Sequence, residues 1–279
     1  MRQDPRYRAL QKAMRDLLRT VTFPCAVHAE LLDGGDRCVV FSFNGTTAFG
    51  AASIIKLPIL VCIAQLVESG KLDWNQPVSL TVGAPHGTGL LELLDGSRDW
   101  SVHDLCVMMM GVSDNMACNQ LLELVQMERA NEILRSLGYN ATVIRRKMMD
   151  RDKLARGIDN TVTALETSDM LARLYEGRLI SPTASERMLG YLRMNQLRDL
   201  IAWPLPGSAV LAGKTGGMPG SLLDAELVTA SATNTYSLCV FASGFDRAIQ
   251  AKRLIAQISE TVYEAVVRGD KCHQAGASV

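Results

Sequence analysis

The stretch Ser53-IIKLPILVCIAQLVES-Gly70 is the starting point for interpreting this sequence. Its apolar residues point in every direction on a helical wheel, which predicts a helix that is buried all round and ends at Gly70. Ser53 would lie in the first turn, where free backbone N–H groups and the positive end of the helix dipole favour a developing oxyanion. Lys56 follows on the same face, and burial would lower its pKa by penalising the charged form. A neutral amine can take the proton of a neighbouring hydroxyl, so Ser53 is a candidate nucleophile.

Two further motifs make this Ser-x-x-Lys spacing informative. Alone, the spacing should occur about once by chance in a chain of this length, and a capping serine with a snorkelling lysine would explain it. Ser113-Asp114-Asn115 lies in a predicted break between helices, and Lys214-Thr215-Gly216 follows a predicted strand at 209–212. All three motifs in this order would arise by accident in roughly one of several hundred chains of this composition.

The residue types in these motifs suit acyl transfer. Ser113, placed between two lysines, can relay a proton to a leaving nitrogen. Asn115 offers an amide that can hold both Lys56 and a carbonyl of the substrate. The charge of Lys214 and the hydroxyl of Thr215 suit a substrate carboxylate. Gly217 lets a strand backbone approach closely and donate an oxyanion N–H beside that of Ser53.

Strand-like segments at both ends of the chain surround a helical middle. Strands are predicted at 25–32, 37–43, 209–212, 224–230 and 235–242, and helices at 4–21, 53–70, 101–110, 115–137 and 246–268, with two more opening at Ser168 and Ser181. This pattern predicts one α/β domain, 1–279, with an α/β lobe of about 1–52 and 205–279 and an all-α lobe of about 53–204. The cleft between two such lobes is the expected place for a site.

With these motifs in this order, the chain resembles the class A serine β-lactamases and their relatives among the penicillin-recognising hydrolases. The resemblance covers nearly the whole length of the chain. It implies a β-lactamase-like fold, in which a five-stranded antiparallel sheet is flanked by the terminal helices and carries an inserted all-α lobe. It also implies site residues, which are Ser53, Lys56 and Ser113 for catalysis and Asn115, Lys214, Thr215 and Gly217 for substrate binding.

A long loop predicted at 139–160 departs from this family. The family's loop carries a Glu-x-x-x-Asn element that activates the deacylating water, whereas this chain has no glutamate between Thr142 and Asn160. Asp150 is the candidate for a shorter catalytic base, and pairing with the loop arginines is the alternative role for it. Asp159 with Arg145 or Arg146 resembles the ion pair that closes the family's loop.

Composition narrows the class of protein. The 279 residues include 29 acidic and 29 basic ones without a basic run, which argues against a nucleic-acid surface. No apolar run approaches membrane-spanning length, and residues 2–21 lack the apolar core of a secretory leader. Seven scattered cysteines are typical of reduced thiols in a cytoplasmic protein, and a periplasmic or secreted location is expected instead if a leader was trimmed. Isolated histidines and the lack of metal-ligand motifs predict neither a metal nor a cofactor.

These observations favour a serine hydrolase that opens β-lactam amides through an acyl-serine, with slow deacylation. One alternative is an esterase or D,D-peptidase-like acyl hydrolase on the same scaffold. Another is a penicillin-binding sensor that is acylated but turns over poorly. Each of these acts on a small molecule, and the sequence predicts no oligomeric state. A P-loop does not fit because Ser208 stands where it needs glycine, and a Ser-His-Asp triad does not fit because no histidine neighbours a motif serine.

Overall fold

The computed structural model describes residues 5–33, 36–81, 83, 85–94, 98–231 and 234–276. The chain divides into two compact units. The first, called here the sheet unit, comprises Met1–Phe49, Thr163–Ala172 and Arg198–Val279, and the second, called the helical unit, comprises Gly50–Val162 and Arg173–Leu197. The segment 163–172, which the sequence places in the all-α lobe, therefore groups with the sheet unit.

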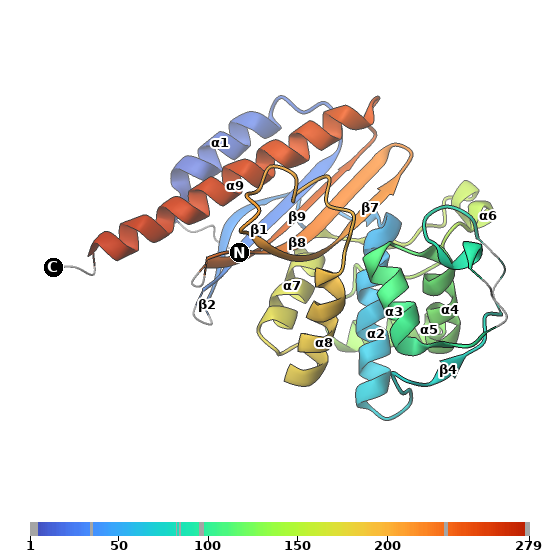
Figure 1. The fold of residues 1–279 in the computed structure, drawn as a ribbon. Coiled ribbons are helices and arrows are strands. Elements are labelled where there is room, and N and C mark those ends of the chain that lie inside the picture. Colours follow the sequence, from blue (N-terminus) through green and yellow to red (C-terminus); the bar gives the residue numbers. More distant parts are fainter. Residues whose placement is uncertain are drawn as a thin grey trace. The chain divides into compact units, whose positions relative to one another are not determined.

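The sheet unit is built on a five-stranded antiparallel sheet in the order β2-β1-β9-β8-β7. Its strands are β1 (Cys25–Asp33), β2 (Asp36–Phe43), β7 (Val210–Met218), β8 (Ser221–Ser231) and β9 (Asn234–Ser243). Two helices from the ends of the chain, α1 (Arg8–Leu18) and α9 (Ala248–Gly276), lie along one face of this sheet (Figure 1). The predicted α/β fold with a five-stranded antiparallel sheet and terminal helices is confirmed.

The core of the sheet unit follows from the periodicity of its elements. Leu10, Met14 and Leu18 recur at helical spacing on α1 and are buried against the sheet. On β9, Leu238 and Val240 alternate toward the same core, as expected for a strand with one face on the helices. The first residue of the helix predicted at 4–21 lies outside the described residues, as do Gly34 and Gly35 between the strands predicted at 25–32 and 37–43. Those two strands, β1 and β2, pair with each other.

The helical unit is organised around α2 (Lys56–Glu68). This helix packs against α3 (Val102–Gly111), α4 (Asn115–Val125), α5 (Met127–Ser136) and α8 (Pro182–Arg193). Every side chain from Lys56 to Ala64 is buried, which confirms the helix predicted to be enclosed on all sides. The remaining α-helices and strands of the described chain are α6 (Arg151–Ala155), α7 (Ala164–Tyr175) and the short strands β3 (Phe49–Gly50), β4 (Pro77–Val78), β5 (Trp100–Ser101) and β6 (Thr161–Val162). Most of α7 belongs to the sheet unit.

Local sequence explains where most of these helices begin. The Ser101 hydroxyl accepts from the Asp104 N–H in a capping box that starts α3, and Ser181 caps α8 ahead of Pro182. Two predictions need correction. The helix predicted over 115–137 is interrupted at Gln126, whose φ of 68° ends α4. Ser168 does not open a helix, because α7 begins at Ala164.

The position of Ser168 shows why a serine is an ambiguous helix signal. Thr163, just before α7, accepts a hydrogen bond at Oγ1 from the Glu166 N–H at 3.1 Å and therefore has the capping role. The Ser168 hydroxyl instead lies 2.7 Å from the Ser237 hydroxyl of β9. It ties α7 to the sheet from within the helix.

Among the residues that the structure describes, no helix combines the length and the apolar composition needed to cross a membrane.

Candidate active site

Ser53 and Lys56 lie at the buried start of α2. Ser53 is part of a 3₁₀ turn, Ala52–Ile55, and Lys56 is the first residue of the α-helix that follows. Ser53 is 8% exposed and Lys56 0%. Burial lowers the pKa of the Lys56 ammonium to about 8, with the charges of Cys118 and Asp114 acting in the opposite direction. Near neutral pH, a minor fraction of this amine is therefore uncharged.

Four oxygen atoms surround the Lys56 nitrogen. Nζ lies 3.2 Å from Ser53 Oγ and 3.0 Å from Ser113 Oγ. It lies 2.7 Å from the Ser113 carbonyl oxygen and 2.8 Å from Asn115 Oδ1. The structure thus brings together four residues that the sequence proposed, Ser53, Lys56, Ser113 and Asn115, within one unit.

The kinds of oxygen in this cluster suit a lysine that loses its proton. The Ser113 carbonyl and Asn115 Oδ1 can only accept hydrogen bonds, so they take the two N–H groups of a neutral amine. The single lone pair of the amine is then left to accept from one of the two hydroxyls, Ser53 Oγ or Ser113 Oγ. Because a hydroxyl can donate to that lone pair, the cluster can accept a proton from Ser53 without a histidine.

Backbone strain concentrates around the same cluster. Six non-glycine residues of the described chain have positive φ, and four of them are Ala52 (42°), His86 (58°), Ser113 (57°) and Met149 (62°). Each such residue costs on the order of 1–3 kcal/mol and persists where its surroundings fix it, often at functional sites. Ala52 directly precedes Ser53, and the carbonyl of His86 accepts from Asn115 Nδ2 at 3.3 Å.

The loop over residues 85–94 holds the Ser113-Asp114-Asn115 motif in place. Asp114 caps α4 by accepting from the Ala117 N–H at 2.9 Å through Oδ1. Its Oδ2 accepts from the N–H groups of Leu90 and Leu91 at 2.7 and 2.8 Å. Thr88 adds a bond from its hydroxyl to the Ser113 carbonyl at 2.8 Å.

Sequence reasoning missed this loop as part of the site, although its two glycines were visible. Gly89 has φ of 128°, and a Cβ there would lie 2.3 Å from Asp114 Oδ2. Gly87 has φ of 104°, and a Cβ there would lie 2.8 Å from Asn115 Nδ2. Both glycines are required for the loop backbone to approach the motif this closely.

The Lys214-Thr215-Gly216 motif lies in the sheet unit, within β7. The prediction that it follows the strand is wrong, because β7 continues through the motif and pairs with β8 from Val210 to Met218. Lys214 is fully buried, and its Nζ donates to the Thr215 carbonyl at 2.7 Å. Gly217 pairs with Leu222 of β8. The strand β7 forms one edge of the described sheet.

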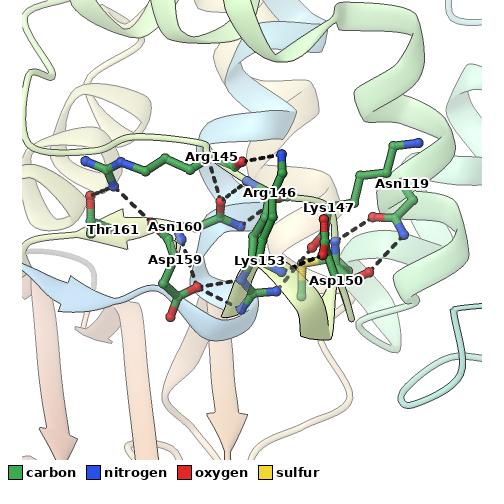
Figure 2. Close-up of polar contacts among 10 residues, drawn as sticks. Asn119, Arg145, Arg146, Lys147, Asp150, Lys153, Asp159, Asn160 and Thr161 are labelled. Atoms are coloured by element: carbon green, nitrogen blue, oxygen red, sulfur yellow. Dashed lines mark hydrogen bonds and ion pairs between the residues drawn. The ribbon is translucent and has the colours of Figure 1, made fainter. Parts of the chain in front are cut away.

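The long loop between α5 and α7 is closed by paired charges (Figure 2). Arg146 is 5% exposed, and its Nε and Nη2 lie 2.8 and 2.7 Å from Asp159 Oδ1. The predicted ion pair is therefore confirmed for Arg146. Arg145 instead donates to the Asp159 carbonyl and to the Thr161 hydroxyl, both at 3.0 Å. The Asn160 side chain holds the facing part of the loop by accepting from the N–H groups of residues 145 and 146.

Two contacts fix the part of this loop where the family's base is expected. Asn119 of α4 accepts from the Met148 N–H at 2.7 Å and donates to the Met148 carbonyl at 3.1 Å (Figure 2). Asp150 caps α6, since its Oδ1 accepts from the Lys153 N–H at 3.0 Å. The role of Asp150 as the deacylating base stays a prediction, and its carboxylate has a structural task.

The part of the chain that the structure describes contains no group of three or more His, Cys, Asp or Glu side chains arranged to hold a metal ion.

Solved structures share this fold over nearly the whole chain. PBP-A matches with a TM-score of 0.83 and 23% identity, covering 94% of this chain and 97% of that one. A mutant of PBP-A, solved as an acyl-enzyme complex with penicillin-G, matches with a TM-score of 0.84 and 22% identity over 93% and 97%. A β-lactamase from Sphaerobacter thermophilus matches with a TM-score of 0.82 and 25% identity over 92% and 96%.

A curated relative matches a smaller part of the sequence. The β-lactamase regulatory protein BlaB of Streptomyces cacaoi is 26% identical over 107 residues, which is 37% of this chain and 34% of that protein. The match thus spans about a third of its length. The profile of the beta-lactamase enzyme family, by contrast, matches residues 9–266. The chain therefore belongs to the beta-lactamase enzyme family.

Proposed function

We propose that this protein is a serine acyl hydrolase of the class A β-lactamase type, in which Ser53 is acylated by a β-lactam and the acyl-serine is hydrolysed slowly. The observation that carries this proposal is the lysine cluster. A buried amine with a lowered pKa lies within hydrogen-bond distance of Ser53 Oγ and Ser113 Oγ. This arrangement activates a serine at neutral pH without a metal or a histidine.

In the proposed acylation, Ser53 Oγ attacks the lactam carbonyl carbon as its proton passes to the Lys56 amine. The carbonyl electrons move onto oxygen, where the backbone N–H of Ser53 stabilises the negative charge. The resemblance to the family implies Gly217 as the second N–H donor. The C=O bond then re-forms and the C–N bond breaks. The leaving nitrogen takes a proton through Ser113, and Lys56 supplies that proton. Water later attacks the ester, releases a carboxylic acid and restores Ser53.

Substrate recognition in this proposal uses the residues of β7. The ammonium of Lys214 and the hydroxyl of Thr215 bind a carboxylate on the acyl donor, as the resemblance to the family implies. Asn115 holds Lys56 through Oδ1, and its amide nitrogen offers a donor to a substrate carbonyl. A carboxylate-bearing β-lactam is the small-molecule class that matches this set of groups.

Slow deacylation follows from the long loop. It holds no glutamate between Thr142 and Asn160, and Asp150 caps a helix. Because Asp150 is a shorter base than the family's glutamate, hydrolysis of the acyl-serine should lose part of the factor of about 10²–10⁴ that a general base contributes. The acyl-enzyme complex of the PBP-A mutant with penicillin-G supports the proposal that a chain of this fold can hold such an adduct.

The same loop favours one alternative in particular. A chain that is acylated and then hardly turns over would act as a penicillin-binding sensor. An esterase or D,D-peptidase-like hydrolase would use the same serine on a different acyl donor. The lifetime of the adduct separates the sensor from the hydrolase, and the preferred donor separates the β-lactamase from the esterase.

The proposed nucleophile is tested by intact-mass spectrometry after mixing with penicillin. We expect a mass increase equal to one penicillin in the wild type and none in Ser53→Ala. Ser69→Ala is the matched control, because Ser69 is an exposed serine at the other end of the same helix. It should be labelled as the wild type is. An adduct on Ser53→Ala would refute the mechanism.

A further inference from the structure

Strand β8 carries two buried carboxyl groups on one face, next to the Lys214-Thr215 motif. Asp224 and Glu226 are each 1% exposed and lie two residues apart, so they share a face of the strand. In the register of the sheet, Thr215 is opposite Asp224 and Gly213 is opposite Glu226. The threonine proposed to bind substrate is therefore in direct contact with a buried acid.

The two oxygens of Asp224 have different partners. Oδ2 accepts from the Ile201 N–H at 2.9 Å, and an amide N–H can only donate. Oδ1 lies 2.9 Å from Thr215 Oγ1, and a hydroxyl can either donate or accept. The Ile201 bond therefore fixes the orientation of the carboxyl, whereas the direction of the Thr215 bond depends on whether Asp224 holds a proton.

We propose that Asp224 is a positioning residue whose protonation decides whether Thr215 can donate to the carboxylate of an acyl donor, an inference that rests on the proposed function. When Asp224 is ionised, the single hydroxyl hydrogen of Thr215 is donated to it, and Thr215 presents only lone pairs to the substrate. When water supplies a proton to Asp224 Oδ1, Asp224 donates to Thr215 Oγ1. The threonine hydrogen is then available to a substrate carboxylate.

Burial places this protonation near neutral pH. It raises the pKa of Asp224 to about 7, while the N–H of Ile201, the hydroxyl of Thr215, the charge of Lys214 and the N–H of Ala225 act in the opposite direction. A carboxyl group with a pKa of about 7 is half-protonated near pH 7. A change of one pH unit therefore changes the donor capacity of Thr215 substantially.

A second buried acid and a buried thiol also lie around Asp224, and the pKa of each is raised. Burial, followed by the charge of Asp224, raises the pKa of Glu226 well above its usual value, against the charges of Arg198 and Lys214. Within the described residues, neither oxygen of Glu226 has a hydrogen-bond partner, which also favours the neutral acid. On β9, burial raises the pKa of the Cys239 thiol, and nearby Asp224, Glu226 and Glu30 add to this. From α9, the Ser259 hydroxyl donates to the Ile201 carbonyl at 2.7 Å and brings no charge.

Gly213 leaves the space on β7 that the Glu226 carboxyl occupies. A Cβ at this position would lie 2.2 Å from Glu226 Oε2 and 2.2 Å from the Ala225 carbonyl oxygen. The carboxyl of Glu226 thus occupies the space that a side chain on β7 would need. It is a suitable control for Asp224, because it is equally buried on the same strand and does not contact Thr215 in register.

The experiment compares two acyl donors that differ only in the carboxylate. The second-order rate constant for acylation of Ser53 is measured from pH 6 to pH 8 with benzylpenicillin and with its methyl ester. Because Lys56 serves both donors, its titration cancels in their ratio. The acylation rate constant for benzylpenicillin divided by that for its methyl ester should fall about tenfold from pH 6 to pH 8. The protonated fraction of a group with a pKa of about 7 falls by the same factor. A ratio that does not change with pH would overturn the inference.

Two variants assign the effect to one residue. In Asp224→Asn, the amide oxygen can accept from Ile201 and the NH₂ group can donate to Thr215, which imitates the protonated acid at every pH. In this variant, the ratio of the two acylation rate constants should stay, from pH 6 to pH 8, at the value that the wild type shows at pH 6. Glu226→Gln should keep the wild-type pH profile. A wild-type profile in Asp224→Asn, or a flat one in Glu226→Gln, would contradict the assignment. If Asp224→Asn does not fold, the wild-type profile and the Glu226→Gln profile still decide the question.

Failure of this inference is distinguishable from failure of the proposed function. If both compounds acylate Ser53 and their ratio is flat, the serine mechanism stands and the role of Asp224 is refuted. If neither compound acylates Ser53, the proposed function fails and the inference about Asp224 fails with it.

Discussion

The helical unit contains two regions that use polar groups in opposite ways. Around Lys56, four neutral oxygens converge on one nitrogen whose pKa is lowered by burial, and two of them are hydroxyls that can give up a proton. In the long loop, Asp159 is paired with Arg146, and Asp150 accepts the Lys153 N–H at the start of α6. The groups of the first region can transfer a proton, whereas those of the second stabilise the conformation of the loop.

This difference separates the two halves of the proposed reaction. Forming an acyl-serine needs an activated nucleophile and a proton relay, and the lysine cluster supplies both. Breaking it needs a base that activates water, and the loop offers carboxylates that already serve the backbone. The comparison therefore predicts an enzyme that is acylated faster than it is deacylated.

The largest effect is expected from removing the amine. Lys56→Met keeps the length and burial of the side chain but cannot accept the proton of Ser53, so acylation by penicillin should slow by about 10²–10⁴. Adduct formation by intact mass is the measurement. Lys71→Met, at an exposed lysine just beyond α2, is the control and should behave as the wild type does.

The lowered pKa of Lys56 predicts the pH dependence of acylation by an uncharged acyl donor. Because the charged form of Lys56 dominates below a pKa of about 8, the rate should rise with pH up to that value and then level off. A profile without this rise would mean that Lys56 does not act as the base.

The second largest effect is expected from introducing a glutamate into the long loop, which has none between Thr142 and Asn160. The backbone of Met148 is held on both sides by Asn119, which lies one helical turn beyond Asn115 on α4. A carboxylate introduced as Met148→Glu would therefore extend from a fixed backbone and should shorten the adduct lifetime by on the order of tenfold or more. Met148→Gln has the same shape without the basicity and should leave the lifetime unchanged. Equal lifetimes in the two variants would show that the loop does not face the acyl group.

The smallest effect on chemistry is expected at the loop that holds Asp114. Gly89→Ala should destabilise the fold by about 1–3 kcal/mol more than Gly70→Ala, because overpacking adds to the strain of positive φ. A Cβ at Gly70, whose φ is 68°, meets nothing within 4 Å, whereas at Gly89 it would meet Asp114. Denaturant unfolding gives the comparison. Similar losses in both variants would mean that the contact with Asp114 is unimportant.

Much of the site could be predicted from local sequence. The spacing of Ser53 and Lys56 places both on one helix face, and an apolar run on all sides of that helix predicts its burial. The caps at Ser101 and Ser181 depend on neighbours in the sequence and were equally visible.

The features that escaped prediction depend on distant partners. The bond from Thr88 to the Ser113 carbonyl joins residues that the sequence does not relate, and the Ser168 hydroxyl of α7 has its partner on strand β9. Because β7 pairs with β8, the strand also continues through Gly216 and Gly217, although glycine is a poor strand former. In each case tertiary contacts override the local preference.

The central claim is tested most directly by following the penicillin adduct through time in the wild type and in Asp150→Asn. Asparagine caps a helix about as well as aspartate, so this variant removes the carboxylate and keeps the start of α6. The account predicts that the wild-type adduct forms faster than it decays, and that it decays more slowly still in Asp150→Asn. Fast decay that Asp150→Asn does not alter would contradict it, because another group would then be activating the water.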